Sequence, residues 1–134
     1  MPERPSPKAV ALAFLADVSA GRLDDAFNRV IPDVAWEMIA PAPYGGTMNR
    51  AGAAKFFAEH FGSKLSGPLV LAVETVTAEA DRVAVEARVQ ANTKSGPPYE
   101  NRVHFLIFVE GDKIVALREY IDSATLIAFI SRDA

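Results

Sequence analysis

The side chains best suited to move a proton lie in a stretch rich in Val, Ile and Phe near the end of the chain. Glu119 lies in the segment KIVALREYID, and Asn101 and His104 lie in the preceding segment YENRVHFLIF. A carboxylate on an apolar surface is a candidate base, because burial raises the pKa of a carboxyl group towards neutral pH. Whether an imidazole lies beside Glu119 depends on how the two segments pair.

The two segments flank Gly111-Asp112 and predict a long antiparallel hairpin, since β-branched and aromatic residues surround a Gly/Asp turn. A two-residue loop places His104 opposite Glu119, whereas a three-residue loop that includes Glu110 places Val103 there. We favour the second register, because it separates an apolar face from a polar one. The apolar face then holds Asn101, Val103, Phe105, Ile107, Val115, Leu117, Glu119 and Ile121. The other face holds Arg102, His104, Leu106, Phe108, Arg118 and Tyr120.

A second polar stripe precedes the hairpin. Glu86, Arg88 and Gln90 alternate with apolar residues, so their side chains share one face of a strand. Turned inward, Arg88 would orient Glu119 or bind an anionic substrate, and Glu86 would contact that substrate. Turned outward, the stripe is an ordinary solvated face. A structural ion pair with Arg88 is likewise the alternative role of Glu119.

Trp36, Met38 and Tyr44 are candidates for shaping a ligand site, with plain core packing as the alternative, and Asn101 is a candidate hydrogen-bond donor. The two histidines are far apart in the chain, no HExxH motif occurs and cysteine is absent. We therefore expect no metal site and no cofactor.

Length and composition predict one domain. Residues 1–7 carry three prolines and are expected to form a flexible tail before a single domain over residues 8–134. A net charge of −3 argues against nucleic-acid binding. No apolar run reaches the ~20 residues of a membrane span and the start lacks a signal-peptide pattern, so a cytoplasmic location is expected.

The order of elements predicts an α+β fold. Helices are expected over residues 8–20 and 23–30, a strand over 34–39, an irregular loop over 40–48, and a third helix from an Asn49 cap to Gly62. Strands over 69–77 and 82–93 and the hairpin then complete an antiparallel meander, and Ser123 caps a short last helix. Helices first and strands later predict a curved sheet wrapped around the helices.

Three segments resemble the NTF2-like superfamily, in its SnoaL-like and ketosteroid-isomerase-like branch: GRLDDAFNRVIPDVAWEM, PYGG, and GDKIVALREYID before a short helix. The resemblance spans residues 8–131. It implies a cone-shaped α+β fold, a deep apolar pocket between helices and sheet, and a homodimer formed through the sheet face.

The resemblance also implies site residues. The catalytic tyrosine and aspartate positions of ketosteroid isomerases fall on Phe14 and Met38, which cannot do that chemistry. In limonene-epoxide hydrolases the water-holding positions match Trp36 and Met38, the base matches Glu119, and the remaining Arg and Asp match Glu86 and Arg88 in reversed order. In SnoaL-type polyketide cyclases the base matches Glu119 and the histidine position falls on Phe105.

Together, these observations predict a cofactor-independent isomerase, cyclase or dehydratase acting on a small, largely apolar molecule. Glu119 and Arg88 are the predicted catalytic residues. The predicted substrate-binding residues are Trp36, Met38, Tyr44, Glu86, Asn101, Val103, Phe105 and Leu117. The alternatives are a binding domain without catalysis and an interaction domain that uses the sheet face.

Overall fold

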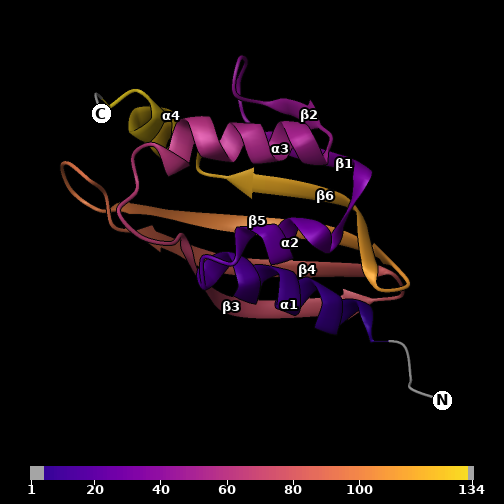
Figure 1. Cartoon of the computed structure of the whole chain (residues 1–134). Helices are drawn as coiled ribbons and strands as arrows, with labels where there is room; N and C mark the ends of the chain where they lie inside the picture. Colours follow the sequence, from indigo (N-terminus) through magenta and orange to yellow (C-terminus); the bar gives the residue numbers. More distant parts are fainter. Residues whose placement is uncertain (1–4, 133–134) are drawn as a thin grey trace.

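The computed structural model describes residues 5–132, which form helices packed on one face of a curled, open sheet (Figure 1). The helical elements are α1 (Pro7–Ser19), α2 (Leu23–Asn28), α3 (Arg50–Phe57), which continues as a short π-helix over Ala58–Gly62, and α4 (Ser123–Ile130). The strands are β1 (Val30–Ile39), β2 (Gly46–Met48), β3 (Val70–Glu79), β4 (Arg82–Ala91), β5 (Tyr99–Glu110) and β6 (Lys113–Ile121). The predicted α+β fold is confirmed.

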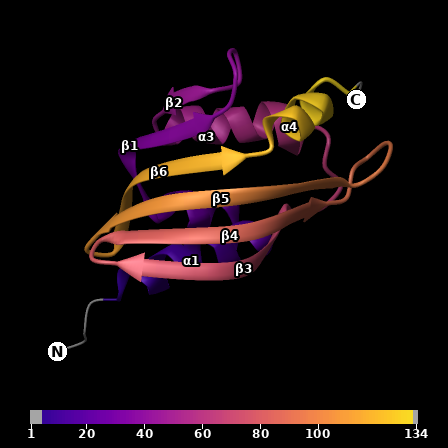
Figure 2. The same ribbon diagram turned by 180° about the vertical axis from the view of Figure 1, so that it is seen from behind.

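The sheet has the strand order β2-β1-β6-β5-β4-β3. Strands β3 to β6 form the predicted antiparallel meander, and β1 pairs in parallel with β6. Helices α1, α2 and α3 lie on the inner face in Figure 1, and the view from behind shows an outer face that no helix covers (Figure 2). The parallel pair places the first and last strands side by side, although they are far apart in sequence.

The hairpin register differs from both registers considered for it. The turn has two residues, with Glu110 paired to Lys113, and Gly111 adopts the positive φ of 61° that favours glycine. A register shift between Phe108 and Val109 leaves Val115 as an extra residue, which is a β-bulge. Phe105 therefore lies opposite Glu119, in place of the expected Val103.

The bulge restores the predicted faces. Asn101, Val103, Phe105 and Ile107 are buried on the inner side of β5, and Glu119 shares that side. The exception is Val115, whose place in the core is taken by Ile114, which is fully buried.

Several element ends also differ from expectation. Residues 1–4 of the expected tail lie outside the described residues, but the tail cannot include Pro7, which begins α1 after the cap provided by Ser6. Residues 46–48, expected to be irregular, pair with β1 as strand β2. Asn49 caps α3 as predicted, whereas α4 is capped by Asp122 and not by Ser123.

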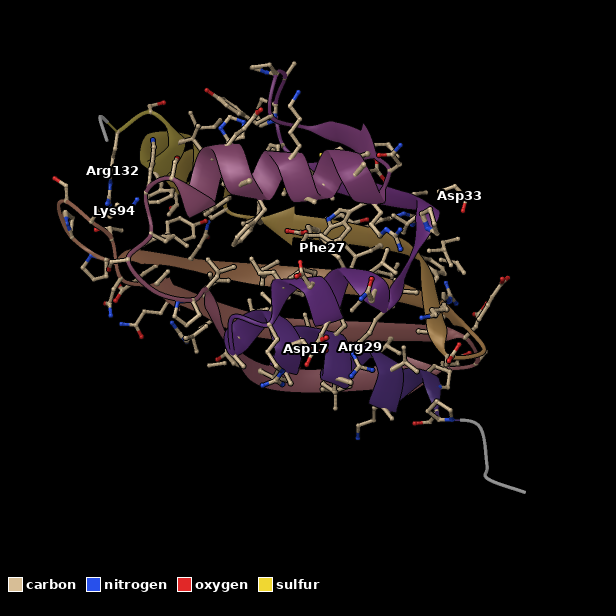
Figure 3. The ribbon with its side chains drawn as sticks, in the orientation of Figure 1. Asp17, Phe27, Arg29, Asp33, Lys94 and Arg132 are labelled. Carbon is tan, nitrogen blue, oxygen red and sulfur yellow. The ribbon has the colours of Figure 1, made fainter. Side chains whose placement is uncertain are left out.

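A charged cluster fixes the end of α1 to α2. Asp17 is buried, and its two carboxylate oxygens accept hydrogen bonds from Arg22 (2.9 Å) and Arg29 (2.7 Å). Figure 3 shows Asp17 and Arg29 side by side in front of the sheet, with Phe27 between α2 and α3. The cluster therefore holds α2 against the end of α1.

Candidate active site

A cavity of about 90 Å³ lies between the helices and the inner face of the sheet, and its walls are almost wholly apolar. This volume is several times what one water molecule needs. Eight of the twenty lining residues are aromatic, among them Phe14, Phe27, Phe56, Phe57, Phe61 and Phe105. Of the predicted substrate-binding residues, Trp36, Met38, Val103 and Phe105 line the cavity. Such a space suits a small, flat, largely apolar molecule.

Glu119 is the one carboxylate among the described residues of the cavity lining. It extends inward from β6, beside Met38 of the parallel strand β1. Desolvation by the surrounding rings raises the pKa of Glu119 to about 7, and the hydrogen bond from Trp36 opposes part of that rise. At neutral pH the carboxyl group is therefore close to half ionised, which suits a general base.

Trp36 positions this carboxyl group. Its indole Nε1 donates a hydrogen bond of 2.6 Å to Glu119 Oε1. The indole is held by edge and tilted contacts with the rings of Phe14 and Phe27, at centroid distances of 5.8 and 5.9 Å. Because one oxygen is occupied by Trp36, the other is the atom available to a bound molecule.

Tyr99 is a second polar group in the lining, and the sequence analysis missed it. Its hydroxyl accepts a hydrogen bond of 2.7 Å from Asn101 Nδ2, which also donates to the carbonyl of Asp122 (3.2 Å). Desolvation raises the pKa of Tyr99 to about 12, and the charge of Glu119 adds to the rise. Asn101 is thus buried behind Tyr99 and does not line the cavity. The i, i+2 spacing of Tyr99 and Asn101 on a buried strand face was the available signal.

The expected inward orientation of Glu86 and Arg88 is wrong. Both side chains project from the outer face of β4, because Val85, Ala87 and Val89 occupy the inner positions. Arg88 forms an ion pair with Glu74 (3.4 Å), and Glu86 accepts a hydrogen bond from Thr75 (2.7 Å). Glu119 therefore has neither Arg88 as a catalytic partner nor an ion pair with it.

Three other candidates also lie outside the cavity lining. His104 is on the outer face, where its ring meets Tyr120 edge-on at 6.1 Å. Tyr44 contacts His60 in the same manner at 6.0 Å, and Leu117 is fully buried in the core. Within residues 5–132 no group of three or more His, Cys, Asp or Glu side chains is arranged to bind a metal ion.

A comparison of the sequence with protein families agrees with this fold. The SnoaL-like domain model matches residues 11–117. The chain belongs to the SnoaL-like family. No curated protein matches the sequence of this SnoaL-like domain. None of the helices within residues 5–132 is long and apolar enough to cross a membrane.

Solved structures share the SnoaL-like fold at low identity. An NTF2-like protein of Burkholderia thailandensis is 18% identical with a TM-score of 0.78, over 96% of this chain and 99% of the other. IdmH, a putative polyketide cyclase of Streptomyces antibioticus, is 16% identical with a TM-score of 0.72, over 96% and 100%. A protein of Catenulispora acidiphila with a ketosteroid isomerase-like fold, in complex with trimethylamine, is 17% identical with a TM-score of 0.74, over 96% of both chains. At these identities the likeness establishes the fold alone.

Proposed function

We propose that this SnoaL-like domain is a cofactor-independent enzyme that moves a proton on a small, largely apolar molecule. The observation that carries the proposal is a carboxyl group with a pKa of about 7, oriented by Trp36 inside an aromatic cavity. A buried carboxylate that is partly ionised at neutral pH combines basicity with access to a bound C–H group.

In the proposed step, the free oxygen of Glu119 removes a proton from a carbon next to a carbonyl group. The C–H bond breaks, an O–H bond forms on Glu119, and the electron pair moves onto the carbonyl oxygen as an enolate. Once the proton on Glu119 has been replaced from the solvent, protonation of the same carbon gives hydrogen exchange. Protonation of another carbon of a conjugated enolate gives an isomer. A cyclase or dehydratase would use the same first step.

The test is hydrogen exchange on a simple ketone. The α hydrogens of 2-tetralone exchange with deuterium in D₂O, and mass spectrometry follows the exchange. We expect the protein to accelerate exchange at least ~10²-fold over buffer near neutral pD, as general bases do. Glu119→Gln should return the rate to that of buffer, whereas Glu86→Gln, on the outer face, should leave it unchanged.

A binding domain without catalysis is the competing function, and the same experiment separates the two. Trp36 is the single tryptophan of the chain and lies in the cavity wall, so its fluorescence reports binding there. Binding of 2-tetralone together with exchange at the buffer rate would favour the binding domain. Binding of trimethylammonium ion in preference to the ketone would instead indicate that the natural ligand is an organic cation. An ionised carboxylate among aromatic rings also suits such a ligand.

A further inference from the structure

The buried hydroxyl of Tyr99 has a hydrogen-bonding capacity that its protein partners do not use. Tyr99 is 2% exposed, and its oxygen accepts the hydrogen bond from Asn101. A phenol has one O–H to donate, and among the described residues the Tyr99 hydroxyl forms a hydrogen bond only as the acceptor from Asn101. Buried donors are normally paired, so this O–H is suited to a partner in the cavity that Tyr99 lines.

The hydroxyl is also held in place. Asn101 is fixed by its own bonds, since its amide nitrogen donates to the Asp122 carbonyl and its oxygen accepts from the Arg102 backbone N–H. The ring of Tyr99 packs on Phe129 at 4.6 Å and on Phe61 at 5.5 Å. A donor fixed on both sides loses little freedom when it binds a ligand, which favours a role in binding.

Tyr99 and Glu119 lie at different positions along the cavity wall. Its hydroxyl lies at the level of Asn101, and Asn101 is four residues along β5 from Phe105, the partner of Glu119. Four residues of strand correspond to about 13 Å. Inward-reaching side chains shorten this separation, and the wall between the two polar groups includes the apolar side chains of Val103 and Ile121.

We infer that Tyr99 donates a hydrogen bond to an oxygen of the bound molecule, so that the ligand is an apolar ring compound with an accepting oxygen directed to Tyr99. This inference rests on the proposed function for the role of Glu119, but the binding role of Tyr99 does not require catalysis. Trp36 cannot serve as that donor while its N–H is bound to Glu119. Tyr99 thereby selects carbonyl compounds over hydrocarbons of the same shape.

The experiment compares 2-tetralone with tetralin, which has the same two rings without the oxygen. Binding is measured by Trp36 fluorescence in the wild type and in Tyr99→Phe, which keeps the ring contacts. We expect Tyr99→Phe to weaken 2-tetralone about tenfold and to change tetralin less than twofold. Tyr120→Phe, which removes an exposed hydroxyl from the outer face, should change neither.

Two measurements keep the result independent of folding and of catalysis. Repeating the titrations in the Glu119→Gln background should give the same tenfold ratio, even if the exchange experiment fails. The carbonyl stretch of bound 2-tetralone should lie at lower frequency in the wild type than in Tyr99→Phe. Equal weakening of both compounds, an unchanged carbonyl frequency, or no binding of either compound to the wild type would each overturn the inference.

Discussion

At the scale of single residues, burial of the Glu119 carboxyl group destabilises the folded state at neutral pH. The carboxyl has an ordinary pKa of 4.5 when solvated and a pKa of about 7 in the folded chain, because desolvation disfavours its charged form. Between these two pH values the folded state binds more protons than the unfolded state. The contribution of Glu119 to the free energy of unfolding therefore falls as the pH rises from about 4.5 to 7.

Glu119→Gln removes this pH dependence while retaining an acceptor for the Trp36 N–H. The pKa difference corresponds to at most about 3 kcal/mol. We expect the variant to be more stable than the wild type by about 1–3 kcal/mol at pH 8 and nearly equal to it at pH 4.5. Urea unfolding at both pH values measures the difference, with Glu86→Gln as the exposed control. A variant that is less stable at pH 8 would show that the native carboxylate is stabilised by its surroundings.

At the scale of elements, sequence patterns predict some features of the site correctly and leave others undecided. Alternation along β5 and the last part of β6 identified the buried face, and so the inward position of Glu119, because half-buried strands repeat every two residues. The same alternation on β4 leaves both directions open, and the outward one is correct. An alternating stripe of Glu86, Arg88 and Gln90 fits either face, and only the packing of Val85, Ala87 and Val89 under the helices decides between them.

The hairpin bulge at Val115 explains why neither predicted hairpin register is correct. Turn length alone offered two pairings, and a bulge adds a residue without a clear mark in the local sequence. Tyr99 was missed for a related reason: it begins β5 beyond the end of β6, so its closeness to the cavity depends on how α4 closes that end. The long-range pairing of β1 with β6 likewise had no local signal.

The Asp17 cluster is the contact between elements whose removal has the clearest expected effect. The hydrogen bond from Arg29 is the main cause that holds the pKa of Asp17 below its ordinary value, and Arg22 adds to it. The stabilisation of the folded state by the Asp17 carboxylate is therefore fully present above pH 4. It is lost as the pH falls through the lowered pKa of Asp17 in the folded state. Both arginines are partly exposed, which limits the energy involved.

Asp17→Asn should lower the free energy of unfolding by about 1–3 kcal/mol at pH 7, because two charge-assisted hydrogen bonds to a buried group are weakened. The loss should shrink at pH 3. Asp33→Asn is the matched control, since Asp33 is exposed on β1 (Figure 3). Thermal or urea unfolding measures both variants. Equal stabilities of wild type and Asp17→Asn at pH 7 would contradict this role of the cluster.

At the scale of the whole molecule, the outer sheet face offers a surface for a second copy of the chain. Ile39 and Tyr120 are neighbours there, with exposed fractions of 36% and 43%, and His104 packs on Tyr120 from the next strand. The guanidinium of Arg118 lies 5.4 Å from the ring centre of Phe108 on the same face. Aromatic and arginine side chains of this kind are enriched in protein interfaces.

We propose a homodimer through this face and predict that Tyr120→Glu disrupts it. Sedimentation velocity should give about twice the chain mass of 14.4 kDa for the wild type and a shift towards the monomer for the variant. Ala9→Glu adds the same charge on an exposed position of α1 and should remain dimeric. A monomeric wild type at micromolar concentrations, or a fully dimeric Tyr120→Glu, would rule out this interface.

The bond between Trp36 and Glu119 joins residues 83 positions apart, across two strands that meet only when the last strand docks on the first. Until that docking, Glu119 remains hydrated and ionised at neutral pH. Completion of the sheet at pH 6 must therefore draw a proton from the solvent, so folding in a weakly buffered solution should make it more alkaline. Contacts between residues this distant in sequence slow folding. The cavity thus acquires its base, its orienting indole and its proton together when β6 docks on β1.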